Sequence, residues 1–191
     1  MRNMLLVAFL ALAPVSVSAQ QADRPEDLAG WRSVKWGMTP EQAKTALGDE
    51  AEALSEETAR SKNLVFGNGE WPVRLAIPKY ELAGHEFSVS LAFDPKGGLR
   101  LVSLRLSGPI LRPTDEVDSV FEILENQITE KYGAPSLHKI DDSAGRAVTL
   151  SEKRDAWTLS HTVISLGMMG VTGRGTLTFS YAPRSVADDK L

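Results

Sequence analysis

The chain of 191 residues contains no cysteine, and this absence alone removes several kinds of function. Disulfide bonds, thiolate metal sites, thiol catalysis and a lipid-modified N-terminal cysteine all require the missing side chain. The fold must therefore be held together by its hydrophobic core and its hydrogen bonds. A chain of this length can bury such a core within one domain.

Blocks of positive charge are also absent. The chain has 21 Lys and Arg against 25 Asp and Glu, a formal net charge of −4, and the basic residues form no stripe along the sequence. Proteins that bind nucleic acid usually carry such a stripe because they contact phosphates. We therefore expect no nucleic-acid partner.

Only one long apolar run is present, and it lies at the N-terminus. Arg2 precedes the apolar segment Met4–Ala13, and the small residues Val17–Ala19 follow it. This order is typical of a secretory signal peptide, so we expect residues 1–19 to be removed by cleavage after Ala19. The run is shorter than the roughly 20 residues that span a bilayer, so no membrane anchor is expected after cleavage. The mature protein is thus expected to be periplasmic or secreted.

The segment "WGMTPEQAKTALG", residues 36–48, carries the signals of a short capped helix. Thr39 is a good N-cap, Pro40 suits the first helical position, and Gln42 completes a capping box with Thr39. Gly48 is a natural stop. We expect this helix to dock on the core, with no chemistry of its own.

Aromatic residues near the two ends of the chain are expected in the same core. Trp36 and Met38 should be buried where the first helix begins, and Trp157 lies within a periodic stretch. Large apolar side chains within periodic elements are usually core residues.

From Leu64 onward the apolar period changes to two. Residues 73–77 and 87–93 alternate apolar and small or polar side chains, and residues 99–106 follow after the turn signal Asp94–Gly98. This pattern predicts an antiparallel meander with one face toward water.

The second half begins with a longer helical pattern. Thr114 is a candidate N-cap, and Gly133 and Pro135 end the helix. Its apolar stripe has helical spacing and comprises Val117, Val120, Phe121, Leu124, Ile128 and Tyr132. Three strands are expected after it, at residues 147–150, 157–166 and 177–181.

Together these patterns predict an α+β fold in which one antiparallel sheet carries two helices packed on one face. The helix-then-strands order occurs twice, so the single domain expected at 31–181 has a candidate two-half repeat, 31–108 and 109–181. Residues 20–30 are expected to form a flexible lead-in and residues 182–191 a disordered tail.

Three segments resemble parts of small exported bacterial proteins, many of which have no known function. These are "GMTPEQAKTALG" (37–48), "GHEFSVSLAFDPKGGLRLVSLRL" (84–106) and "ITEKYGAP" (128–135). They are similar to segments of proteins with the β-lactamase-inhibitor-protein-like fold and of the SmpA/OmlA (BamE) outer-membrane assembly lipoproteins. The resemblance implies a helix-on-sheet fold and a non-enzymatic binding habit. Those families carry a lipid-bearing cysteine or disulfides that this chain lacks, so no target and no functional residue is transferred.

Candidate residues for chemistry are scattered. His85, His138 and His161 fall in three separate segments, and His138, near Asp141 and Asp142, gives the only local cluster of interest. Those residues lack the spacing of a calcium loop, so we interpret them as a polar loop and expect no metal and no cofactor.

Catalytic motifs are equally weak. Ser160 and His161 are adjacent, and adjacent residues on a strand point to opposite faces. The glycine spacing of residues 170–175 lacks a βαβ unit and is interpreted as a hairpin loop. We therefore expect a non-catalytic module. The alternative is a small periplasmic hydrolase or ligand-binding protein whose site forms only in three dimensions.

Two loops carry residues that suit contact with another envelope or secreted protein. Trp71 lies in one, residues 67–72, and the pair Met168 and Met169, followed by Arg174, lies at the other. Glycines on both sides of the methionines suggest a hairpin tip, and Trp, Met and Arg are favoured at interfaces. The competing interpretation places the methionines and Trp71 in the core.

Overall fold

A computed structural model describes residues 28–144 and 149–184. The expected signal peptide, most of the lead-in and the tail beyond Arg184 lie outside these residues. Within them the chain forms a ten-stranded antiparallel sheet in the order β3-β5-β6-β7-β12-β11-β10-β9, with β4 paired to β5 and β8 paired to β12. A separate two-stranded ribbon pairs β1 with β2.

The elements have the following bounds. The strands of the first half are β1 (Gly30–Trp31), β2 (Val34–Lys35), β3 (Glu52–Ala53), β4 (Val65–Phe66), β5 (Trp71–Leu82), β6 (His85–Phe93), β7 (Leu99–Leu106) and β8 (Arg112–Pro113). Those of the second half are β9 (Leu137–Ala144), β10 (Thr149–Thr158), β11 (Thr162–Val171) and β12 (Arg174–Pro183). The helices are α1 (Pro40–Leu47), α2 (Glu56–Ser61) and α3 (Thr114–Tyr132), with a 3-10 turn at Gly48–Glu50.

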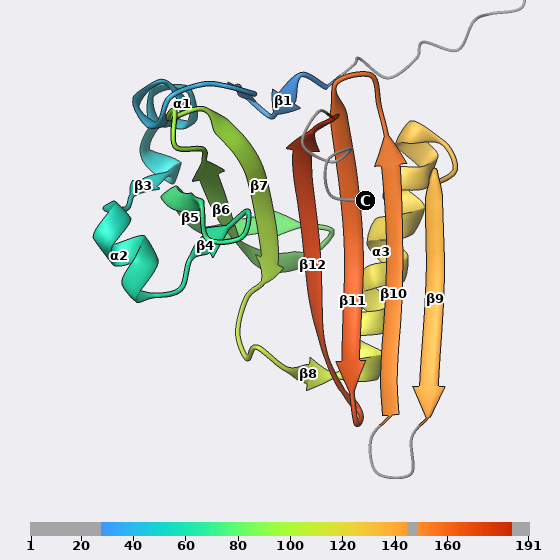
Figure 1. Ribbon diagram of the computed structural model, residues 1–191. Coiled ribbons are helices and arrows are strands. Elements are labelled where there is room, and N and C mark those ends of the chain that lie inside the picture. Colours follow the sequence, from blue (N-terminus) through green and yellow to red (C-terminus); the bar gives the residue numbers. More distant parts are fainter. Residues whose placement is uncertain (1–27, 145–148, 185–191) are drawn as a thin grey trace, which may run out of the picture.

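The predicted α+β arrangement, with two helices on one face of the sheet and a repeated helix-then-strands order, is wrong. The described chain has three helices beside its ten-stranded sheet, and only α3 runs along the long strands (Figure 1). Helix α1 contacts the β1–β2 ribbon and β5, and α2 contacts β5. The intervening elements β3, β4 and β8 have two residues each, too few to show a period in the sequence.

The capped helix α1 is confirmed. The N–H of Gln42 donates to Thr39 Oγ1 over 3.3 Å, and the N–H of Thr39 donates to Gln42 Oε1 over 3.0 Å. Gly48 ends the helix at a φ of 67°, which favours glycine. Trp36 and Met38 are half-buried and pack at the margin of the core, whereas Trp157 is fully buried as expected.

Helix α3 has the predicted stripe, and Val117, Phe121 and Leu124 are among its buried residues. Its predicted cap is wrong, because Pro113 occupies the N-cap position and Thr114 Oγ1 is buried without a hydrogen bond from the described residues. Instead, the backbone N–H of Thr114 donates to the carbonyl of Gly173 over 3.1 Å. The start of the helix is therefore fixed by the β11–β12 turn.

The segment Gly167–Gly170 is not a hairpin tip, and the competing interpretation, which placed the methionines at the end of a strand, holds for the backbone. These residues lie inside β11, and the turn follows at Thr172 and Gly173, with φ of 50° and 76°. Two such left-handed residues are what a two-residue hairpin turn needs.

Gly170 of this segment serves close packing. Gly170 pairs with Gly175 across β11 and β12. A Cβ on Gly170 would lie 2.3 Å from Ser151 Oγ and 3.5 Å from Thr114 Cγ2, and one on Gly175 would lie 3.7 Å from Val117 Cβ. The sheet is thus thinned where α3 begins, a common use of glycine within strands.

The strands of the second half are longer than predicted. β9 covers residues 137–144, which the sequence suggested as a polar loop, and β12 continues to Pro183 rather than ending at Tyr181. The two halves of the sheet join through β7 and β12, where Val102–Arg105 pair with Thr178–Tyr181.

We predict that Thr39→Ala lowers the free energy of unfolding by about 1 kcal/mol, because the N–H of Gln42 loses its acceptor. The matched control is Thr45→Ala, since Thr45 is exposed on the same helix and its hydroxyl donates only to the carbonyl of Glu41. That control should change stability by less than about 0.5 kcal/mol. Urea unfolding of the three proteins measures both effects, and equal losses would contradict the capping account.

Candidate functional site

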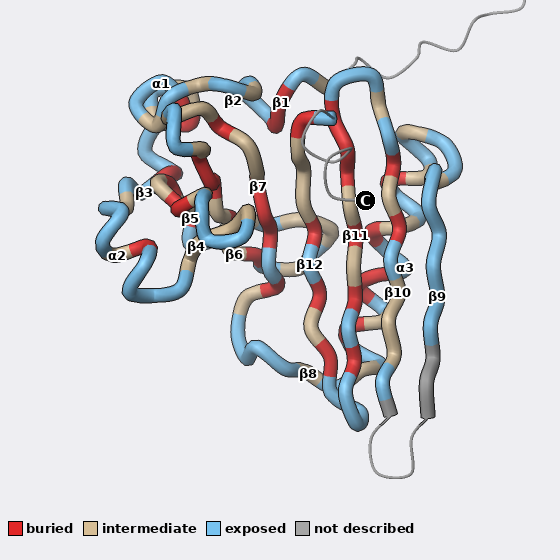
Figure 2. Tube along the Cα trace, viewed as in Figure 1, coloured by how far each residue is buried: buried red, intermediate tan, exposed pale blue. Residues whose placement is uncertain are grey.

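The sheet of the second half has one closed and one open face. Along β11, Ile164, Leu166 and Met168 are buried on the face that α3 covers, and residues between them, such as Ser165, are more exposed (Figure 2). Alternate strand residues point to opposite faces, so Ser165 and Met169 belong to the open face.

A hollow of about 560 Å³ crosses this open face. Its floor comes from β10, β11 and β12. Phe66 and Trp71 of the β4–β5 hairpin line it from the first half of the chain, and Leu137 of β9 lines it from the far edge of the sheet. We call it the open-face groove.

Trp71 is positioned by a glycine. A Cβ on Gly67 would lie 2.4 Å from Trp71 Cδ2, so the indole packs directly on the Gly67 backbone. Gly67 also has a φ of 60°, in the left-handed region that favours glycine. The half-buried indole is therefore held against the turn of the hairpin.

The groove is apolar with hydroxyl groups on its floor. Its apolar lining includes Leu101, Ala156 and Val163, and its hydroxyls come from Ser165, Thr176, Thr178 and Ser180. The charged side chains on the β9 side form ion pairs with one another. Glu152 lies 3.1 Å from Arg154 and 3.4 Å from Lys139. Apolar contact and neutral hydrogen bonding are thus what this surface offers.

Exposed apolar side chains extend the groove along the open face. The register pairs Leu150 with Val171 and Glu152 with Met169, so Leu150, Val171 and Met169 share this face. All three are exposed, and Met169 is exposed over 57% of its surface. We call these three residues the open-face patch.

The structure separates the four residues predicted to touch a partner. Trp71 and Met169 both line the open-face groove. Met168 also borders it, but its side chain belongs to the core and is only 3% exposed. Arg174 lies outside the groove lining, and its guanidinium donates to the carbonyl of Leu111 over 2.7 Å.

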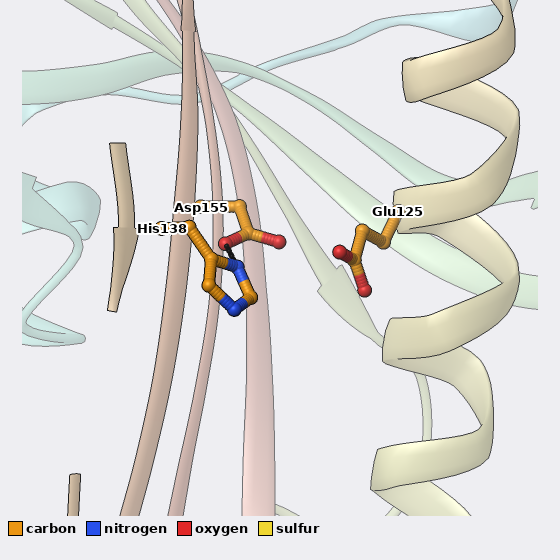
Figure 3. A group of neighbouring side chains, drawn as sticks. All are labelled: Glu125, His138 and Asp155. Carbon is orange, nitrogen blue, oxygen red and sulfur yellow. Dashed lines mark hydrogen bonds and ion pairs between the residues drawn. The ribbon is translucent and has the colours of Figure 1, made fainter. Parts of the chain in front are cut away.

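A second cluster lies on the closed face, at the margin of α3. Glu125 comes from α3, His138 from β9 and Asp155 from β10, where the register sets His138 opposite Asp155 (Figure 3). One ligand atom of each residue lies within 4.8 Å of the others, and His138 Nδ1 is 2.6 Å from Asp155 Oδ1. We call these residues the Glu–His–Asp cluster.

The electrostatics of this cluster are set by burial. The side chain of Asp155 is fully buried, and that of His138 is about half exposed. Asp155 Oδ2 is buried and receives no hydrogen bond from the described residues while Glu125 is ionised. Burial and then the negative charge of Asp155 raise the pKa of Glu125, and a hydrogen bond that protonated Glu125 makes to Asp155 acts in the same direction.

Sequence reasoning grouped His138 with the wrong acids. Asp141 pairs with Glu152 across β9 and β10, which places it on the open face, where it lies 3.6 Å from Lys139. The side chain of Asp142 lies outside the described residues. Asp155 could have been found from its alternation with Trp157, which puts a carboxylate on the buried face of a strand.

A second hollow, of about 740 Å³, lies where the described chain begins and ends. Ser160 and His161 both line it, because they belong to the β10–β11 turn; the prediction that they sit on a strand with opposed side chains is wrong. Its basic lining residues are Lys35, Arg100, His161 and Arg184. His85, at the start of β6, lines neither hollow.

No protein-family model, curated protein or solved structure matches the chain. The resemblance to envelope proteins therefore stays a prediction. Within residues 28–144 and 149–184, no helix combines the length and apolarity needed to cross a bilayer.

We predict that mild peroxide treatment oxidises Met169 well before Met168, because their side chains lie on opposite faces of β11 and only Met169 is exposed. Tandem mass spectrometry of the peptide that holds both residues measures each sulfoxide over time. Oxidation of the two at the same rate would contradict the assigned register of β11.

Proposed function

We propose that this protein is an exported, non-catalytic module that binds another envelope or secreted protein on the open face of its sheet. The observation that carries the proposal is the combination of the open-face groove with the open-face patch, on the face that α3 does not cover. Single exposed apolar residues are common on protein surfaces, but a contiguous set beside a groove usually marks an interaction site.

The residue types support a protein partner. Tryptophan and methionine are enriched in interface cores, and Trp71 and Met169 both line the groove. Burying apolar surface contributes about 25 cal/mol per Å², so a partner that covers this patch gains binding free energy from it. The floor consists of strands β10 to β12, which are hydrogen-bonded along their lengths, so binding would order few additional groups.

Export rests on the sequence alone. The signal pattern at residues 1–19 and the absence of cysteine agree with a protein that folds outside the cytoplasm without disulfides. The resemblance to the SmpA/OmlA (BamE) lipoproteins and to the β-lactamase-inhibitor-protein-like fold supports both parts of the proposal. The proteins that the chain resembles are exported, and they imply a non-enzymatic binding habit.

The alternative is a hydrolase or small-ligand-binding protein, and one observation favours it. The Glu–His–Asp cluster is a group of titratable side chains that forms only in three dimensions. However, none of its three residues lines either hollow described above. A catalytic site needs such a group beside the space where substrate lies, so we prefer the binding module.

The experiment is capture of partners from a periplasmic extract of the native host, compared between three forms of the immobilised protein. Met169→Asp places a charge in the open-face patch. Ile140→Asp is the matched control, because Ile140 is equally exposed, at 55%, but pairs with Lys153 and so lies on the other face of the sheet.

We expect wild type and Ile140→Asp to retain the same envelope or secreted protein, and Met169→Asp to retain at least about tenfold less, which is about 1.4 kcal/mol. Both substitutions are at exposed sites and should leave the melting temperature nearly unchanged. Equal capture by all three forms, or capture of no envelope or secreted protein, would contradict the proposal.

A further inference from the structure

The Glu–His–Asp cluster has more negative charge than its described surroundings balance. Glu125 and Asp155 face each other, as Figure 3 shows. The nearby cation is Lys153, whose ammonium contacts Asp118. Two carboxylates therefore meet beside one ammonium, which already contacts a third carboxylate.

One buried oxygen of Asp155 shows where this excess negative charge is concentrated. Asp155 Oδ1 already contacts His138, whereas Oδ2 is buried, points toward Glu125 and has no hydrogen bond from the described residues. A buried carboxylate oxygen without a partner is costly, so it calls for a cation or a proton at the point where the three side chains meet.

The charged groups that act on Glu125 are Asp155, His138 and Lys153. The ammonium of Lys153 lies 5.8 Å from the ring centroid of Phe121 on α3 and contacts Asp118 of the same helix. From β9 and β10 come His138 and Asp155. The surroundings on the sheet side are apolar, with Trp157 buried on the same face of β10.

We propose that Glu125, His138 and Asp155 form a site for a divalent metal ion of the zinc class. Ligand atoms bound to one tetrahedral Zn²⁺ lie roughly 3.4 Å apart, since each is about 2.1 Å from the metal. The three atoms lie within 4.8 Å of one another, so small side-chain rotations bring them to that spacing. An imidazole beside two carboxylates favours Zn²⁺ over Ca²⁺ and Mg²⁺, which prefer oxygen ligands.

The position of the site indicates its role. β9 is the last strand of the sheet order and pairs only with β10 among the described strands. A metal held by Glu125 of α3 and His138 of β9 links this edge strand to the helix, with Asp155 of β10 between them. Because the ion binds the folded chain more tightly than the unfolded one, it stabilises the fold as its concentration rises.

The test uses the purified chain without an affinity tag, stripped of metal with EDTA and dialysed. Zn²⁺ alone is titrated in by calorimetry, with Ca²⁺ and Mg²⁺ in parallel, and thermal melts are recorded with and without Zn²⁺. We expect one Zn²⁺ per chain, a higher melting temperature with Zn²⁺, and no binding of Ca²⁺ or Mg²⁺.

Each of the variants Glu125→Gln and His138→Gln replaces one of the three proposed ligands with a neutral side chain. Each should weaken Zn²⁺ binding by at least about tenfold and abolish the rise in melting temperature. The matched controls are Glu122→Gln, at an exposed position one turn earlier on α3, and His85→Gln, on β6, and both should bind as wild type does.

Two results would overturn the site. No Zn²⁺ binding by the wild-type chain would mean that a proton shared between Glu125 and Asp155 satisfies the buried oxygen instead. Equal weakening by ligand and control variants would mean that Zn²⁺ binds elsewhere on the surface. Asp155 is left unchanged because its fully buried side chain makes loss of folding hard to separate from loss of binding.

Discussion

The packing of α3 against one face of β11 and β12 is the constraint on which the second half of this protein depends. A helix of 19 residues is about 28 Å long, and strands of 10 residues are about 33 Å long, so one helix covers nearly the whole length of these strands. The stripe from Val117 to Ile128 fills the closed face. Because strand side chains alternate, the opposite face is left to water or to a partner.

The part of the sheet that α3 covers determines where both candidate sites lie. The open-face groove lies on the side that α3 does not cover, and its apolar lining has no helix to pack against among the described residues. The Glu–His–Asp cluster lies at the margin of the closed face, where the sheet continues to β9 beyond the strands that α3 mainly contacts. Polar groups collect at that margin because apolar packing ends there.

The sequence predicted the parts of the fold that depend on local patterns. The capping box of α1, the hairpin of β6 and β7 around Asp94, and the stripe of α3 are each encoded within a short window, and all three are present. In the turn, Asp94 accepts hydrogen bonds from the N–H groups of Lys96 and Gly98 and pairs with Arg100 at 2.7 Å.

The parts that depend on distant pairing could not be predicted in this way. β9 has the sequence "LHKIDDSA", whose polar residues give no strand pattern. The strand is stabilised by its pairing with β10. The methionine pair resembled a turn because glycines flank it, but Gly170 serves contact with the start of α3 and Gly167 lies within β11, so neither glycine reverses the chain. The Glu–His–Asp cluster joins residues from one helix and two strands, and no spacing in the sequence connects Glu125 to Asp155.

The central claim is that one face of β11 is closed by α3 and the other is open, and the absence of cysteine makes this directly measurable. Single cysteines introduced along the strand, Ile164→Cys, Ser165→Cys, Leu166→Cys, Gly167→Cys and Val171→Cys, can each be labelled with a thiol reagent under native conditions. The account predicts fast labelling at 165, 167 and 171 and slow labelling at 164 and 166. Labelling that is equally slow at both sets would contradict it, because another part of the protein would then cover the face to which we assign partner binding.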